Sequence, residues 1–177
     1  MLGGKQIEDQ CDAIIKSGQQ PLAAEAFVTK PGKLDTCSQL IYAVVRPWQG
    51  GQQQEGDLLF TAVWNALEKA AEMKLSTVAI AGVDWSFPAS VACQNVLDAV
   101  AEFQTQPYHF DDMLLIDSRD QLVNHFHENL ARHFGKENVK MDSGQPAGIP
   151  TVHTATTGMS PFHLLIYLLT YLLTFAY

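Results

Sequence analysis

The chain has 177 residues, enough for one domain of ordinary size. Its formal net charge is −8, from 11 Lys and Arg against 19 Asp and Glu, so it lacks the cationic excess on which non-specific nucleic-acid binding depends. With 47% hydrophobic residues, the chain is expected to fold around a core. Its three cysteines (Cys11, Cys37 and Cys93) form no C-x-x-C pair, which excludes a disulfide-dense scaffold and a cysteine zinc site and favours a reducing compartment.

Apolar strands alternate with amphipathic helices along the first 134 residues. In chain order, the periodicity predicts a helix over 3–16, strands over 24–29 and 40–45, a helix over 57–73, a strand over 77–81, a helix from about Pro88, a strand over 113–116 and a helix over 119–134. The run LIYAVV at 40–45 is almost continuously apolar, as expected of a strand covered on both faces. This alternation predicts a layered α/β domain with a largely parallel sheet.

Ligands of such sheets bind beyond the carboxyl ends of the strands. The segments 46–51, 82–88 and 117–120 follow predicted strands and are therefore the candidate binding loops. The sequence GVDWSFP at 82–88 leaves a strand and opens a helix, so its N–H groups can face a phosphate. Trp85 can stack on a ribose or base; the equally weighted alternative is that Trp85 and Phe87 close the top of the core.

Other chemistry finds less support in the sequence. His125 and His133 share a helix face, but the H-E-x-x-H pattern that begins at His127 fails at Ala131, so solvated histidines are the favoured interpretation. No P-loop, G-x-G-x-x-G or G-x-S-x-G motif is present. Cys93 lies in an apolar helix and is interpreted as a core thiol rather than a nucleophile.

Three stretches resemble a macrodomain, the ADP-ribose-binding α/β module: LGGKQIEDQCDAIIKSG, TKPGKLDTCSQLIYAVVRPW and TVAIAGVDWSFPASVACQNVLDAV. The nearest similarity is to the tandem macrodomains of mono-ADP-ribosyltransferases of the poly(ADP-ribose) polymerase family. The resemblance covers about residues 2–134 and implies a three-layer fold with a mostly parallel central sheet. It implies binding of ADP-ribose or mono-ADP-ribosylated proteins in the nucleus or cytoplasm, with no specific nucleic-acid partner.

The resemblance also assigns the binding residues, while it implies no catalytic residue, no metal and no cofactor beyond ADP-ribose as a possible ligand. The residues that it places at ADP-ribose are Val45, Arg46, Pro47, Gly82, Val83, Asp84, Trp85, Ser86, Phe87 and Asp117.

Departures from the family pattern bear on this expectation. The family's first strands, with an N-A-A-N segment and a Gly-rich loop, are not found here, so an N-terminally truncated macrodomain, a truncated isoform, is expected. One missing strand lies in the middle of the family's sheet, so the sheet is expected to rearrange or to leave a gap.

The loop at 82–88 also departs from the family pattern. Val83 and Ser86 stand where the family has loop glycines, and Asp84 stands where it has an apolar residue. A carboxylate about 4 Å from a phosphate costs roughly 4 kcal/mol at an effective dielectric of about 20, or about a thousandfold in affinity. We therefore expect weak or absent ADP-ribose binding. A degenerate module for protein interaction is the alternative. An ADP-ribosyl hydrolase ranks lower, because the resemblance implies that hydrolytic members use the Gly-rich first loop, which is not found here. In the transferases that carry such macrodomains, transferase activity belongs to a separate domain.

The sequence divides into a body at 1–134, a Gly- and Pro-rich flexible linker at 135–158 and a hydrophobic tail at 159–177. Residues 162–177 carry no formal side-chain charge, and a membrane contact is expected only through them. Three interpretations of this tail remain open: a membrane anchor, the translation of an alternative exon or intron, and a packed core helix. The period of four in YLLTYLLT favours the second.

Overall fold

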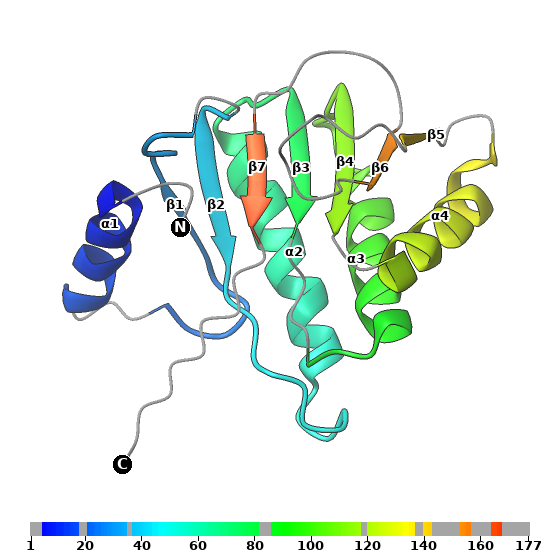
Figure 1. Cartoon of the computed structure of the whole chain (residues 1–177), viewed down its shortest axis with the longest axis horizontal. Helices are drawn as coiled ribbons and strands as arrows, with labels where there is room; N and C mark the ends of the chain where they lie inside the picture. Colours follow the sequence, from blue (N-terminus) through cyan, green and yellow to red (C-terminus); the bar gives the residue numbers. More distant parts are fainter. Residues whose placement is uncertain are drawn as a thin grey trace.

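The computed structural model describes residues 5–17, 21–34, 37–81, 86–117, 120–136, 140–142, 153–156 and 164–167. The described residues form helices on both sides of one sheet (Figure 1). The helices are α1 (Lys5–Lys16), α2 (Glu55–Glu72), α3 (Ala89–Phe103) and α4 (Asp120–Phe134), and the strands are β1 (Ala26–Thr29), β2 (Gln39–Ala43), β3 (Thr77–Ala81), β4 (Asp112–Asp117), β5 (Lys140–Asp142), β6 (His153–Thr156) and β7 (Leu164–Tyr167).

The strands of the described residues form one sheet in the order β1-β2-β7-β3-β4-β6-β5. Its four middle strands, β2, β7, β3 and β4, run parallel to one another (Figure 1). The outer strands β1, β6 and β5 pair antiparallel. The prediction of a mostly parallel sheet is thus confirmed for the centre, and the antiparallel strands are confined to the two flanks.

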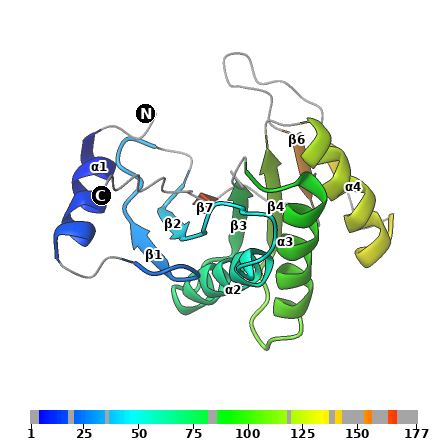
Figure 2. The same ribbon diagram turned by 90° about the horizontal axis from the view of Figure 1, so that it is seen from below.

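Strand β2 shows how the sheet separates two layers of helices. Ile41 and Ala43 are fully buried in the large core that α2, α3 and α4 share. Leu40 and Tyr42 point the other way, because successive strand residues alternate between faces, and they pack with Ile7 of α1. Seen from below, α1 and α2 accordingly lie on opposite sides of β2 (Figure 2).

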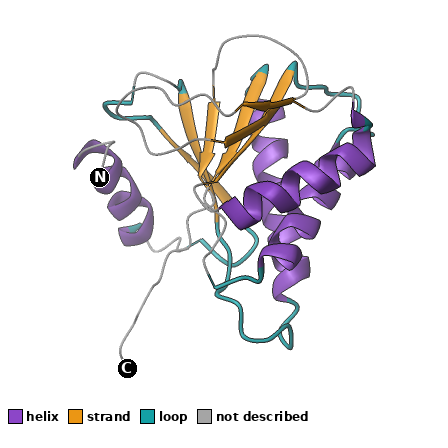
Figure 3. Cartoon of the chain, turned by 45° about the vertical axis from the view of Figure 1, so that its right-hand side comes forward, coloured by secondary structure: helices purple, strands orange, loops and turns teal. Residues whose placement is uncertain are grey.

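The large core lies between the sheet and helices α2, α3 and α4 (Figure 3). Leu59 and Leu67 of α2 and Leu97 of α3 each have 0% of their surface exposed. Pro88 precedes α3, where its missing N–H costs no helical hydrogen bond, and its carbonyl accepts from the N–H of Ala92 at 2.9 Å. These contacts position the loop that enters α3.

The elements predicted for the body are present, with bounds that move by a few residues. The segment after α4 differs from expectation. Strands β5 and β6 lie within the predicted flexible linker, and β7 lies within the tail for which no strand was predicted. The sheet also has no gap at its centre, because β7 fills the position between β2 and β3. An uncharged segment such as LLIY suits this place, since a central strand has no route to water for a charge.

Within the described ranges, no helix combines the length and the apolar character that crossing a bilayer requires.

Candidate functional site

The four parallel strands bring their carboxyl ends to one edge of the sheet. Tyr167, the last residue of β7, pairs with Tyr42 on one side and Ala81 on the other, and Ala81 in turn pairs with Ile116 of β4. The loops that follow β2 and β3 therefore start close together. This is the edge at which parallel α/β sheets bind ligands.

The loops after β2 and β3 are joined at Trp48. Its backbone N–H donates to the Oγ of Ser86 at 2.8 Å. Its indole packs on the ring of Phe87, with centroids 5.3 Å apart and planes at 51°. Phe87 is 3% exposed and belongs to the large core, whereas Ser86 lies at the surface. These two contacts of Trp48 hold the loop after β2 against the loop after β3, and Ser86 stays exposed to solvent.

A buried carboxylate fixes the loop that follows β2. The side chain of Glu55, 1% exposed, accepts hydrogen bonds from the N–H groups of Gln49 and Gln53, both at 2.8 Å. Burial works to raise the pKa of Glu55. The backbone N–H groups of Glu55 itself, Gln49, Gln53 and Gly51 outweigh burial and lower that pKa below its ordinary value. The carboxylate is therefore a structural anion at neutral pH.

Both glycines of this loop adopt a positive φ, and Gly51 leaves room for the indole of Trp48. Gly50 and Gly51 have φ of 90° and 80°, a region that side chains with a Cβ rarely adopt. A Cβ at Gly51 would meet the Trp48 ring at 3.0 Å, closer than ordinary packing. The ring of Trp48 is consequently held between the backbone of Gly51 and the side chain of Phe87.

The structure brings part of the predicted site together. Val45 is buried, Arg46 is exposed and Pro47 is half-buried, and this segment meets Ser86 and Phe87 through Trp48. Other predicted residues cannot be placed at the site: Gly82, Val83, Asp84 and Trp85 lie outside the described residues, and Asp117 is described only as the backbone end of β4.

Two residues that organise this edge were not among the predicted ones. Trp48 lies in the candidate loop 46–51 but is not among the residues assigned to the ligand, and Glu55 lies just before the predicted helix of 57–73. A signal for Glu55 does exist in the sequence. Two glycines followed by an acidic residue at a helix start indicate a tight turn held by a carboxylate on free N–H groups.

Among the residues that the structure describes, the histidines and Cys93 form no reactive cluster. His125 and His127 are half-buried on α4, and in the part of the chain that the structure describes no three His, Cys, Asp or Glu residues could share a metal ion. Burial raises the pKa of Cys93 to about 12, although the amide of Asn129 opposes the shift by donating to its sulfur at 3.8 Å. Cys93 is thus a core thiol and a poor nucleophile, as predicted.

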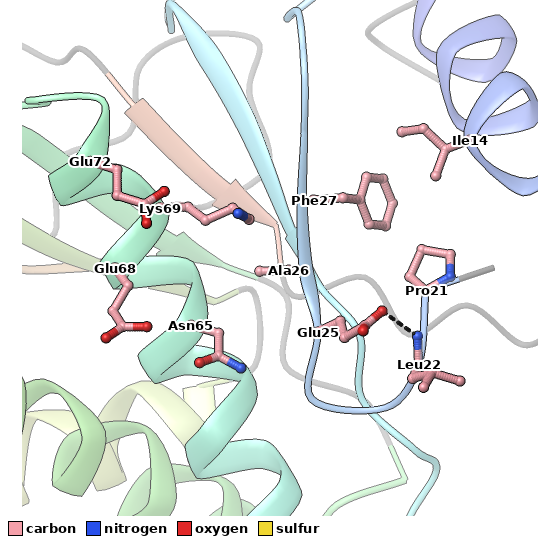
Figure 4. Close-up of a pocket in the computed structure, with 10 residues that line it drawn as sticks. All are labelled: Ile14, Pro21, Leu22, Glu25, Ala26, Phe27, Asn65, Glu68, Lys69 and Glu72. Carbon is pink, nitrogen blue, oxygen red and sulfur yellow. Dashed lines mark hydrogen bonds between the residues drawn. The ribbon is translucent and has the colours of Figure 1, made fainter. Parts of the chain in front are cut away.

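A hollow of about 710 Å³ lies elsewhere, between α1, β1 and α2 (Figure 4). None of its lining residues is a predicted site residue. Glu25, Glu68 and Glu72 outnumber Lys69 on its walls, and the carboxylate of Glu25 accepts from the N–H of Leu22 at 2.7 Å. An excess of negative charge disfavours a diphosphate here. The hollow is therefore not assigned to the predicted ligand.

Comparison with known proteins is consistent with the geometry. Residues 2–84 match the family model of the Macro domain. An uncharacterized protein of Thermotoga maritima is 33% identical over 107 residues, which are 59% of this chain and 18% of that protein. A macro domain-containing protein of Listeria monocytogenes is 29% identical over 108 residues (59% and 61%). An O-acetyl-ADP-ribose deacetylase of an Enterobacter species is 28% identical over 106 residues (58% and 58%). The chain thus spans less than two thirds of these relatives.

Solved structures extend the similarity beyond residue 84. A mutant of the Oceanobacillus iheyensis macrodomain with ADPR superposes with a TM-score of 0.66 at 18% identity, covering 74% of this chain and 73% of that one. The fold is that of a macrodomain. The macro domain of ganglioside induced differentiation associated protein 2 gives the same TM-score and identity, over 77% and 67%. The narrower similarity to macrodomains of the poly(ADP-ribose) polymerase family stays a prediction, since the curated relatives named here are bacterial.

Proposed function

We propose that the sheet edge at which residues 45–48 meet Ser86 and Phe87 binds ADP-ribose, or ADP-ribose attached to a protein, and that this affinity is lower than in macrodomains with glycine-rich loops. The observation that carries the proposal is the junction of the two loops: Trp48 is tied to Ser86 and Phe87 at the carboxyl edge of a macrodomain sheet. The Oceanobacillus iheyensis macrodomain, which has the same fold, is recorded with ADPR in a mutant form and also with ADP, which supports this ligand class.

The charges of the two loops explain why the affinity is expected to be reduced. Arg46 is exposed at this edge and offers a cation to a diphosphate. Asp84 is one of the residues outside the described ranges, and the sequence places it two positions before Ser86. The resemblance to macrodomains places Asp84 at the phosphates of the ligand, where a carboxylate opposes Arg46, so we expect the two side chains to change the affinity in opposite directions.

The test is isothermal titration of the full chain with ADP-ribose at neutral pH. Asp84→Asn removes one negative charge with little change in volume, and it is expected to tighten binding at least tenfold. The matched control is Asp57→Asn, at an exposed position in the first turn of α2, which should leave the affinity unchanged. A low-micromolar dissociation constant for the unaltered chain contradicts the reduced affinity. Undetectable binding by both the chain and Asp84→Asn favours the alternative, a protein-interaction module.

Hydrolysis is a second candidate because a relative is named an O-acetyl-ADP-ribose deacetylase. The described residues 44–54 and 86–88 contain no Asp, Glu or His, and the neighbouring Glu55 is occupied by backbone N–H groups. The described parts of these two loops therefore offer no free general base, and Asp84 lies outside them. We expect no release of acetate from O-acetyl-ADP-ribose above the buffer rate; turnover that Ser86→Ala abolishes would establish the enzyme instead.

A further inference from the structure

A short turn, residues 49–53, lies behind the edge at which the two candidate loops meet. Its backbone has a positive φ at Gly50 and Gly51, and so does Gln54 just beyond it (90°, 80° and 58°). Glycine adopts such angles freely, whereas Gln54 is strained, and a strained backbone persists only where surrounding contacts hold it. The contacts that hold this turn therefore decide the shape of the edge in front of it.

The turn is held mainly by one buried side chain. The carboxylate of Glu55 accepts hydrogen bonds from the backbone N–H groups of Gln49 and Gln53, at the two ends of the turn, both at 2.8 Å. Glu55 is 1% exposed and is the first residue of α2, whose buried face packs in the large core. The exposed amide of Gln53 also donates to the side-chain oxygen of Gln49 at 2.8 Å, where water competes. The carboxylate thus closes the turn from a rigid element.

The turn fixes the indole of Trp48, which directly precedes it. A Cβ added at Gly51 would lie 3.0 Å from the Cη2 atom of the indole and 3.3 Å from its Cζ2 atom, so the ring lies directly against the Gly51 backbone. A Cβ added at Gly50 would meet nothing within 4 Å. Toward the other loop, Trp48 contacts the ring of Phe87 and bonds to Ser86. The orientation of the indole therefore depends on the turn that the carboxylate holds.

We propose that Glu55 and Gly51 are positioning residues of the binding edge, which set the orientation of the Trp48 indole and act on a ligand through it. A side chain that is fixed before binding needs no ordering when a ligand arrives, whereas a released one must be ordered. If ADP-ribose binds at this edge, as proposed above, loss of either contact weakens its binding about three- to tenfold, the usual cost of ordering one side chain. The role in binding thus rests on the proposed function.

The test compares two matched pairs of variants of the full chain. Gly51→Ala and Gly50→Ala both place a Cβ at a positive φ, but only Gly51→Ala meets the indole. Glu55→Gln and Asp57→Asn both remove one negative charge from the first turn of α2, but only Glu55→Gln disturbs the carboxylate that closes the turn. Within each pair, the second variant is the control.

The readout that needs no ligand is the indole N–H signal of Trp48 in a nitrogen–proton NMR spectrum, identified by its loss in Trp48→Phe. This signal should move more in Gly51→Ala and in Glu55→Gln than in the control of each. A variant that moves the signal no more than its control overturns the positioning role of its residue. Thermal melting identifies a variant that fails to fold, and the other pair then decides.

Titration with ADP-ribose distinguishes the positioning role from the proposed function, in chains that also carry Asp84→Asn for tighter binding. Gly51→Ala and Glu55→Gln should raise the dissociation constant about three- to tenfold over their controls. A displaced indole signal with unchanged affinity overturns the role in binding and leaves the proposed function intact. Absence of binding in every chain overturns the proposed function and the role in binding together, while the indole signals still decide whether the two residues position Trp48.

Discussion

The backbone N–H of Trp48 donates to the side-chain oxygen of Ser86 across 38 positions of sequence. This bond joins the loop after β2 to the loop after β3 at the edge where the parallel strands end. The adjacent contact of the Trp48 indole with Phe87 connects the same junction to the core. The relative position of the two candidate binding loops therefore depends on a few contacts that can be changed one at a time.

Replacing Ser86 by Ala should weaken this junction. The Trp48 N–H loses its acceptor, and because the serine is at the surface water replaces it in part, so the free energy of unfolding should fall by about 1 kcal/mol. Urea unfolding measures the loss. Ser90→Ala, at an exposed position in α3, is the control and should change stability by less than about 0.5 kcal/mol. Equal losses in the two variants would show that the bond contributes nothing.

Glu55→Gln should make the stability of the chain less dependent on pH. Because the pKa of Glu55 is lowered in the folded state, its contribution is complete above the ordinary glutamate pKa of about 4.3 and is lost as the pH falls through the lowered value. The variant should therefore be less stable than the wild type at pH 7, and the difference should shrink on acidification.

Urea unfolding at a series of pH values measures that difference. Glu68→Gln, on the exposed side of α2, is the control that corrects for removing one negative charge from an acidic chain. A stability difference that is the same at acid and neutral pH would contradict the anchoring role of the carboxylate.

The core between the sheet and the helices should respond strongly to truncation. Leu97→Ala removes most of a side chain of α3 that is 0% exposed and leaves a cavity in the core. We expect it to lower the free energy of unfolding by about 2–5 kcal/mol. Leu22→Ala provides the matched control, because Leu22 is 68% exposed and its truncation should cost less than about 0.5 kcal/mol. Similar melting temperatures for the two variants would mean that α3 does not pack as described.

The three thiols should be nearly inert in the folded chain. Cys11, Cys37 and Cys93 are all buried, which limits access of a reagent to each. Burial also raises the pKa of Cys11 and brings that of Cys93 to about 12, so the thiolate fractions of these two are small at pH 8. Labelling with a disulfide reagent should be slow for all three and slowest for Cys93, while labelling in guanidinium should be complete within minutes. Rapid labelling of Cys93 in the folded chain contradicts its place in the core.

The local pattern of apolar and polar residues was sufficient to predict the helices and strands of residues 1–134. The continuous apolar run around Leu40 indicates a strand that is buried on both faces. The apolar stripe that includes Leu59 and Leu67 indicates a helix with one buried face. Strands and helices of this kind can be predicted within a few residues because burial of apolar side chains selects one periodicity or the other. Part of the candidate site could be predicted as well, because ligands of parallel α/β sheets bind beyond the carboxyl ends of the strands.

Contacts between distant segments were decided only by the tertiary structure. Nothing near Trp48 indicates that its N–H meets Ser86, and nothing near Glu55 beyond a glycine pair indicates that its carboxylate holds the loop. The uncharged tail segment Leu164–Tyr167 suits a membrane, a core helix or a central strand equally well by composition. Its place between β2 and β3 follows from backbone groups on those two strands that need partners, and hydrogen bonding between segments so far apart in sequence leaves no local pattern to read.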